Sequence, residues 1–469
     1  MADIFIAYSS QNSSIVEKLY TELSSQWDVI YDYLAVDDFS DYIERKIADV
    51  KCVVPIFSAE SRESDYFIDE IQLAKKLKKQ LVAVKLDESD NPLGFGRISF
   101  CDFRGWQGCV NHKGFKQLQQ KLSSVAAPRA KPTRPASIEN GKVLLPTLFQ
   151  SVSSFETQLR PAEAIKALKL FGTPATLVSA YDLVERNNKD YKKLKSELKK
   201  YKAAGGFVLI DSGNYERSRL NDESWQPADL EEALKDITYD WAFCFDALKP
   251  HNNHDKAVNQ VVSAVKRDQK FSSAPVFPIV HAQQTKKGEY ILDNLPNLIV
   301  DIATQLQPTI IAIPERELGD GIVKRVKTVQ EIRSALGKLP FYQPIHLLGT
   351  GNPLTIPLFV AAGADTFDGL EWCRMVVDRK EHRLNHFQHF DFFTYQTELA
   401  DSIVAREALH DKEVNFFAKV IFHNLDYYTD FMCKLRSELA DGNVRSFVGE
   451  EFSKDIVSQI KELIPGLLK

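Results

Sequence analysis

Four acidic residues end apolar runs in the second two-thirds of the chain. The segments FVLID, WAFCFD, IIAIPE and TFD end at Asp211, Asp246, Glu315 and Asp368. A carboxylate is costly inside an apolar core but useful where a strand opens into a site. Carboxylates gathered in one place suit nucleophilic attack at a sugar carbon or acid/base catalysis. The alternative for any one of them is that it caps the helix that follows.

Another acidic residue, Glu70, lies in an amphipathic stretch near the N-terminus, DYFIDEIQLAKKLKK. Helical spacing puts it on the same face as Tyr66, four residues earlier, and one turn from Phe67. The residues alone leave two interpretations open: a site residue, or an ordinary surface glutamate beside Lys75 and Lys79.

Short apolar runs alternate with amphipathic helical patterns around Glu70. This alternation predicts an α/β domain in which a parallel sheet is covered by helices on both faces. The predicted strands are residues 3–8, 28–33, 52–57, 81–86 and 98–103. Ligands of such sheets bind beyond the carboxyl ends of the strands, so we expect Tyr8–Ser10, Tyr33–Phe39 and Ser58–Ser64 around any site.

The same alternation recurs eight times around the other four acids, which predicts a (βα)8 barrel. The predicted strands are residues 143–149, 175–181, 207–211, 241–246, 276–282, 310–315, 344–349 and 366–370. Barrel sites form at the carboxyl ends of the strands, which is where the acids stand. The C-terminal residues beyond the barrel are mainly of helical pattern.

A proline-rich stretch separates the two patterns. Pro128, Pro132 and Pro135 lie among small and charged residues, which is typical of a semi-stiff linker. The predicted parts are a small domain at 1–125, a linker at 126–142, a barrel at 143–390 and a helical C-terminal extension at 391–469.

Composition narrows the class of protein. The 469 residues carry a net charge of −5 and are 44% hydrophobic, which argues against disorder and against bulk coating of nucleic acid. No apolar run reaches the roughly 18 residues that span a bilayer, and the start MADIFIAYSS lacks a signal-peptide pattern. The six cysteines are scattered, so we expect no disulfide framework and a reducing, cytoplasmic location. Because no long apolar run occurs, we also expect no association with a membrane.

Three segments of the barrel region resemble the tRNA-guanine transglycosylase (queuine/archaeosine transglycosylase) family. They are IDSGNY at 210–215, HLLGTGNPLTIPLFVAAGADTFDGL at 346–370 and IFHNLDYYTDFMCKLRSELADG at 421–442. The resemblance implies that Asp368 attacks the ribose anomeric carbon while the displaced base leaves. It implies a general acid/base role for Asp211 and recognition of the base by Asp246.

The departures from that family's pattern are specific. The Cys-x-Cys-x-x-Cys cluster that binds the family's structural zinc is absent after Asp368, so we expect no zinc and no other metal. His281-Ala282-Gln283 stands where the family has Gln-Gly-Gly, and Pro314-Glu315-Arg316 where it has Gly-Gly-Leu. Proline has no N–H to offer a purine, and the glycines that permit close approach are gone. We therefore expect an altered base pocket.

The N-terminal region resembles TIR domains. DIFIAYSSQN at 3–12 is similar to their opening strand and loop, and residues 58–86 are similar to a later strand, helix and strand. Within this block, Ser64-x-Tyr66-Phe67-x-x-Glu70 is similar to the S-x-W-C-x-x-E pattern, with Tyr66 and Phe67 replacing Trp and Cys. The implied fold is flavodoxin-like.

In NAD-cleaving members of that family the glutamate is catalytic. The resemblance therefore implies that Glu70 is catalytic and that NAD+ is a substrate rather than a cofactor. A carboxylate beside the nicotinamide ribose can stabilise an oxocarbenium-like transition state as nicotinamide leaves. The residues implied to bind the substrate are Tyr8, Ser9, Ser10, Tyr33 and Ser64.

Three functions are consistent with this combination. The first is an NAD+ hydrolase effector, of the kind used in bacterial anti-phage defence, activated by self-association of TIR domains and regulated by the barrel as a sensor of a nucleic acid or nucleoside-like ligand. The second is a tRNA or DNA base-exchange transglycosylase whose TIR domain is an interaction module. The third is that both parts are binding scaffolds.

Overall fold

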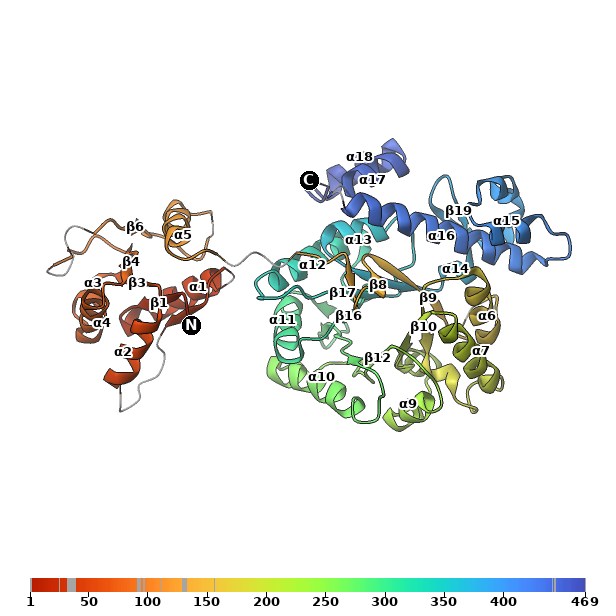
Figure 1. Ribbon diagram of the computed structural model, residues 1–469, viewed down its shortest axis with the longest axis horizontal. Helices are drawn as coiled ribbons and strands as arrows, with labels where there is room; N and C mark the ends of the chain where they lie inside the picture. The colour runs from red at the N-terminus through yellow and green to blue at the C-terminus, as the bar shows by residue number, and fades with distance from the viewer. Residues whose placement is uncertain are drawn as a thin grey trace. The chain divides into compact units, whose positions relative to one another are not determined.

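The computed structural model describes residues 2–24, 26–31, 39–90, 94–95, 98–109, 111–128, 133–155, 157–440, 442 and 444–468, without the side chains of 39–43. The chain divides into two compact units (Figure 1). They are Met1–Thr133 with Gly337–Phe341, and Arg134–Leu336 with Tyr342–Lys469.

The first unit is built on a parallel sheet in the order β2-β1-β3-β5-β6, with β4 also paired to β3. Its strands are β1 (Ile4–Ala7), β2 (Val29–Tyr31), β3 (Cys52–Phe57), β4 (Gln80–Leu81), β5 (Val84–Lys85) and β6 (Cys101–Asp102). Its helices are η1 (Ser10–Asn12), α1 (Ser13–Leu23), α2 (Phe39–Asp49), α3 (Ala59–Arg62), α4 (Asp65–Lys76) and α5 (Lys113–Val125).

Helices cover both faces of this sheet, because its central strands β1 and β3 are apolar and buried on both sides. One cluster packs residues of α1 and α5, such as Leu19 and Phe115, on the sheet. The other cluster packs Ile47 of α2 with Phe67 and Ile71 of α4 on the opposite face. The predicted doubly wound fold is confirmed.

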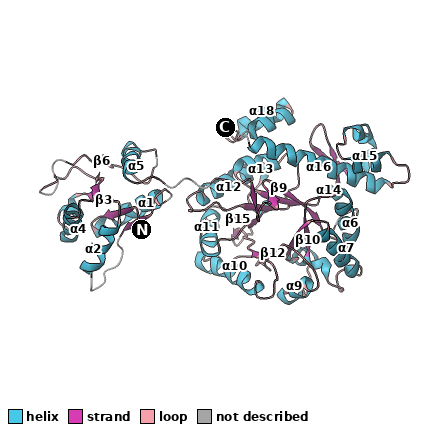
Figure 2. Ribbon diagram, in the orientation of Figure 1, coloured by secondary structure: helices cyan, strands magenta, loops and turns pink. Residues whose placement is uncertain are grey.

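The second unit contains eight parallel strands ringed by helices (Figure 2). The strands are β9 (Thr147–Val152), β10 (Ala175–Ser179), β11 (Phe207–Asp211), β12 (Trp241–Phe243), β13 (Val276–Phe277), β16 (Ile311–Pro314), β17 (Ile345–Leu348) and β18 (Thr366–Gly369). First strand β9 pairs with last strand β18, and a bridge between Ile279 and Ala312 nearly closes the remaining gap. The predicted barrel is confirmed.

The helices of the barrel alternate with its strands. They are α6 (Pro161–Phe171), η2 (Ala180–Leu183), α7 (Tyr191–Ala203), α8 (Asn214–Leu220), α9 (Pro227–Leu234), α10 (His254–Asp268), α11 (Leu295–Leu306), η3 (Glu315–Glu317), α12 (Gly321–Leu336), α13 (Ile356–Ala362) and α14 (Glu371–Arg374). Two hairpins accompany them: β7 (Ser137–Ile138) with β8 (Val143–Leu144), and β14 (Gln283–Gln284) with β15 (Tyr290–Ile291).

Large apolar rings fill part of the barrel interior. Trp241 packs edge-on against Phe207 and Phe277, with ring centroids 4.7 and 5.2 Å apart. Phe149 and Leu209 complete the same buried cluster. The barrel is therefore a packed core rather than a channel, and polar side chains gather where the strands end.

The C-terminal part is a long helix with smaller elements around it. They are the hairpin β19 (Met375–Asp378) and β20 (Arg383–His386), then η4 (Phe387–Leu399), α15 (Ile403–His410), α16 (Phe416–Ala440), α17 (Val444–Glu451) and α18 (Lys454–Leu463). Asn424 of α16 accepts a hydrogen bond from Val377 N and donates to the carbonyls of Trp372 and Met375. This asparagine of the HNL segment therefore holds the segment 372–377, which follows β18, against α16. None of the helices in the described ranges is long and apolar enough to cross a membrane.

A buried carboxylate anchors the amino-end side of the barrel. Asp365, fully buried, accepts hydrogen bonds from Arg134 Nε (2.7 Å), Arg333 Nη2 (2.8 Å) and Tyr342 Oη (2.7 Å). Arg134 also donates to the carbonyls of Val360 and Ala364. Residues from 134 onward, which we predicted within the linker, thus make barrel contacts.

Replacing Asp365 by alanine should destabilise the second unit by about 3–5 kcal/mol, because two partly buried guanidinium groups lose their counter-charge. The matched control is Asp190→Ala, which removes the exposed partner of Arg160 and should cost less than about 1 kcal/mol. Chemical denaturation measures both. Equal costs would contradict the role given to Asp365.

Candidate active site in the barrel

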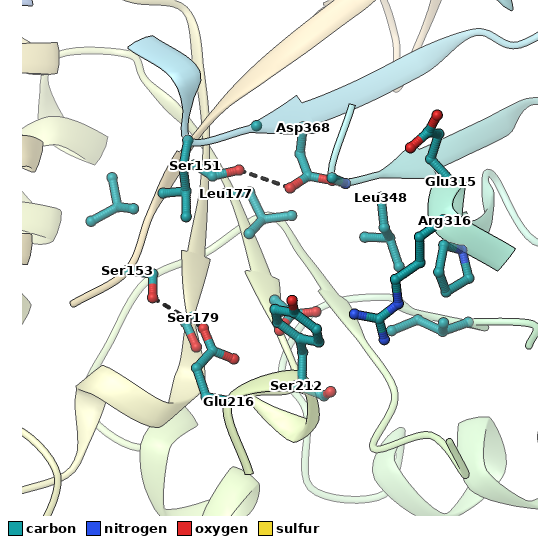
Figure 3. A pocket seen from close by; sticks show the side chains of 18 of the residues that line it. Ser151, Ser153, Leu177, Ser179, Ser212, Glu216, Glu315, Arg316, Leu348 and Asp368 are labelled. Carbon is teal, nitrogen blue, oxygen red and sulfur yellow. Dashed lines mark hydrogen bonds between the residues drawn. The ribbon is translucent and has the colours of Figure 1, made fainter. Parts of the chain in front are cut away.

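A pocket of about 290 Å³ lies at the carboxyl ends of the barrel strands (Figure 3). The predicted acids Asp211, Asp246, Glu315 and Asp368 all line it. None of the four is the N-cap of the following helix; those positions are held by Gly213, Pro314, Asn253 and Leu370. The sequence prediction that these acids form one group is therefore supported by their positions.

Asp368 is held in one orientation by three donors. Its Oδ2 accepts from Ser151 Oγ (2.8 Å), as Figure 3 shows, and its Oδ1 accepts from Gly349 N (3.0 Å) and His346 Nε2 (3.2 Å). His346 is fully buried, and its Nδ1 lies 2.9 Å from Thr366 Oγ1. A carboxylate only accepts hydrogen bonds, so Nε2 must carry the proton. The carboxylate of Asp368 is thus fixed at the pocket wall.

Asp246 is bound to a histidine. Its Oδ2 lies 2.6 Å from His281 Nε2, its Oδ1 accepts from Ser212 Oγ (3.1 Å), and His281 Nδ1 lies 2.9 Å from Glu317 Oε1. Both imidazole nitrogens face carboxylates, so both donate and the ring is a cation. Burial alone would lower the pKa of His281, but the hydrogen bonds and charges of Asp246 and Glu317 raise it to about 10. The proposed base-recognising Asp therefore has a counter-ion of its own.

Asp211 and Glu216 form a second acidic pair. Asp211 accepts from Gly213 N (3.0 Å), and Glu216 of α8 accepts from Ser153 Oγ (3.1 Å). Burial, followed by the charge of Glu216, holds the pKa of Asp211 well above its ordinary value. Burial also raises the pKa of Glu216. A carboxyl whose pKa is raised by burial suits general acid catalysis.

Glu371, directly after β18, completes the acidic wall. Burial raises its pKa to about 7, and Asp368 adds to the effect. A Cβ at Gly351 or Gly369 would overlap its Oε2 atom. The absence of a side chain at both glycines therefore leaves the space that the Glu371 carboxylate occupies.

Three acids of this site, Glu216, Glu317 and Glu371, were not predicted from the sequence. Glu216 and Glu371 lie on short helices after the strands, and Glu317 lies on η3, so no strand-end pattern marks them. In the sequence IDSGNYE, Glu216 follows Asp211 by five residues, which is only a weak indication that both belong to one site. His281 drew notice only as a departure from the family's glutamine.

The available residues do not fit a zinc site of the family's kind. Cys373 is buried, and burial raises the pKa of its thiol, which opposes the thiolate form that binds metal. No group of three or more His, Cys, Asp or Glu placed to hold a metal ion occurs among the described residues.

The candidate residues of the first unit lie at the ends of β1 and β3 and on α4. Ser58 Oγ donates to Asn12 Oδ1 (2.9 Å), which ties the loops after these two strands together. Ser64 caps α4 by accepting from Phe67 N (3.4 Å). In the order β2-β1-β3, these loops are at the switch point where such sheets bind ligands.

Glu70 is on the buried side of α4. It is 9% exposed, because it lies on the face that carries Phe67, Ile71 and Ala74 at spacings of three and four residues. The interpretation of Glu70 as a surface residue is therefore wrong.

The remaining predicted ligand residues differ in exposure. Ser9 is buried, Tyr8 is partly buried with its ring against Tyr31, and Ser10 is exposed. Tyr33 lies outside the described residues.

Comparison with known proteins assigns both units. Residues 4–119 match the family model of the TIR domain. The N-terminal unit carries a TIR domain. The remainder of the chain is similar to tRNA-guanine(15) transglycosylases.

Three of these relatives show the extent of the similarity. The protein of Nanoarchaeum equitans is 26% identical over 54% of this chain and 58% of its own length. That of Methanopyrus kandleri is 22% identical over 50% of each chain, and that of Pyrococcus furiosus 20% over 67% of this chain and 53% of its own. The chain thus spans about half the length of these curated relatives.

The raised pKa of His281 predicts a pH effect on stability. The unfolded imidazole titrates near about 6.5 and the folded one at about 10, so the stabilisation is complete below the first value and is lost as pH rises through the second. Stability of the barrel should fall across this window by at most about 1.4 kcal/mol per pH unit from this residue.

Denaturation of the wild type and of His281→Gln at pH 6 to 10 tests this. The variant should lack this part of the slope, whereas His251→Gln on an exposed turn should retain it. Identical slopes in wild type and His281→Gln would show that His281 is not the titrating group.

Proposed function

We propose that the protein is an NAD+ hydrolase whose catalytic residue is Glu70 and whose barrel controls that activity by binding a nucleoside-type ligand. The observation that carries the first part is the buried position of Glu70 on α4 in a matched TIR domain. A buried carboxylate on this helix supports stabilisation of positive charge at the ribose carbon as nicotinamide leaves.

The barrel supports a sensor role through its pocket. The pocket has room for a small ligand, and the described residues around it bring carboxylates and serine hydroxyls together. His281 forms an ion pair with Asp246, so this carboxylate is not a free hydrogen-bond acceptor for the base that a transglycosylase would exchange. A ligand that binds here and alters self-association of TIR domains would link the two units.

The proposal extends to a bacterial anti-phage setting, in which NAD+ loss halts an infected cell. Phage plating on a host that expresses wild type or Glu70→Ala tests this part. Equal plaque numbers in both strains would remove it.

An NAD+ cleavage assay tests the hydrolase. Glu70→Ala should lower turnover by about a hundredfold or more, because the transition-state charge loses its partner. Asp69→Ala, which removes the neighbouring exposed carboxylate, should retain activity. Specific activity should also rise with protein concentration if association completes the site.

The result that contradicts the hydrolase is equal turnover by wild type and Glu70→Ala. A wild type without activity at any concentration, with and without nucleosides or nucleic acid, would do the same.

A second function, base exchange by the barrel, is favoured by one observation. Asp211, Asp246 and Asp368 line a single pocket, and Asp368 is positioned by three donors. Labelled guanine should then enter tRNA or DNA with the wild type, and Asp368→Asn should lose this by about a thousandfold. Glu381→Gln, at an exposed turn, is the control. Absence of exchange on either nucleic acid with a folded barrel would contradict it.

A further inference from the structure

The barrel pocket is lined by more carboxyl groups than cations. Two of its lining carboxylates have fixed partners: Asp246 has His281, and Glu315 accepts from Arg325 Nη1 with both oxygens (2.9 and 2.8 Å). Asp368 has His346 Nε2 at 3.2 Å, and the other lining carboxyl groups are Asp211, Glu216 and Glu371.

The lining arginines do not cancel this charge. Arg316 is half-exposed, and its guanidinium lies 4.4 Å from the ring centroid of Tyr215 and 4.0 Å from Glu317. Arg374 acts on Glu371, but burial and Asp368 outweigh it, since the pKa of Glu371 stays raised. Among the described lining residues, the carboxyl groups therefore outnumber the cations.

Two buried oxygens on this wall also lack donors. Glu216 is 7% exposed, and its Oε2 accepts no hydrogen bond from a described residue; the same holds for Oε2 of Glu371. A buried carboxylate oxygen without a donor costs free energy. Both residues line the pocket, so a ligand can supply what the protein does not.

The other walls describe the rest of that ligand. Leu177, Ile279 and Leu348 give an apolar surface that suits a flat ring, and Ser151 and Ser179 present hydroxyls that suit a sugar. A volume of about 290 Å³ is close to the lower end of ordinary ligand pockets, roughly 300 Å³. These features fit a single nucleoside.

We propose that the barrel pocket binds a nucleoside whose base carries a positive charge, such as an N-ribosylpyridinium or an N-methylated purine, and that Asp211, Glu216 and Glu371 recognise that charge. This rests on the proposed function of the barrel as a nucleoside site. It names the ligand class that the carboxylates select.

Binding of such a cation is coupled to protons. Glu371 is faced by Asp368 of β18, Arg374 and Cys373 of α14, and Tyr428 of α16. Its pKa of about 7 leaves it partly protonated at neutral pH, and a bound cation favours the ionised form. The cation should therefore release protons on binding, and its affinity should rise from pH 6 to pH 8.

Calorimetry on the full chain tests the proposal with two matched pairs of probes. Nicotinamide riboside is a cation and 1,4-dihydronicotinamide riboside is its neutral counterpart; 1-methyladenosine, cationic at neutral pH, is compared with adenosine. We expect the cation of each pair to bind at least tenfold more tightly. Titration in two buffers of different ionisation enthalpy should show proton release.

Variants assign the effect to the pocket. Glu371→Gln and Glu216→Gln should reduce the preference for the cation at least fivefold, while Glu381→Gln should leave it unchanged. The Glu70→Ala background prevents cleavage of nicotinamide riboside at the TIR domain. The pH dependence of the wild type needs no variant and checks the result if a variant fails to fold.

The outcomes separate the two proposals. Equal or tighter binding of the neutral nucleosides overturns the charge selectivity and leaves the nucleoside site in place. Cation binding that is unaffected by both pocket variants places the ligand elsewhere and also overturns it. Binding of no nucleoside at all removes the sensor site together with this inference.

Discussion

The pairing of β9 with β18 closes the barrel and builds its site. It brings Asp368 opposite Phe149, although more than two hundred residues separate the two in sequence. The same pairing puts Ser151 within hydrogen-bonding distance of the Asp368 carboxylate. One short strand, β18, thus has Asp368 at its carboxyl end, while Asp365 directly precedes its amino end. Each acid is surrounded by donors, and removal of those donors would leave a buried charge.

Along the strands of the barrel, the apolar core and the polar pocket lie at different levels. Aromatic rings around Trp241 fill part of the interior and contribute the burial that stabilises the fold. At the strand ends, carboxylates lie close enough to add to the raised pKa values of Asp211 and Glu371, which costs stability. His281 moderates this cost because its positive charge lies between Asp246 and Glu317.

Both units place acids at the carboxyl ends of parallel strands or on the helices next to them. In the TIR domain, Glu70 is buried by the helix face that packs on the sheet. In the barrel, Asp211 and Asp368 end strands, and Glu216 and Glu371 belong to the short helices that follow. In both units burial strengthens the effect of a neighbouring charge on these acids.

The sequence by itself determined the classes of fold and the strand-end acids. Periods of apolar residues predicted both sheets, and acids directly after apolar runs predicted Asp211, Asp246 and Asp368, because these are local properties of the chain. Only the tertiary structure decided the partners. The imidazolium of His281 between two carboxylates, the space that two glycines leave for Glu371 and the three donors of Asp368 join segments far apart in sequence. A local sequence pattern does not show which distant residues come into contact, because barrel closure and strand register determine these contacts.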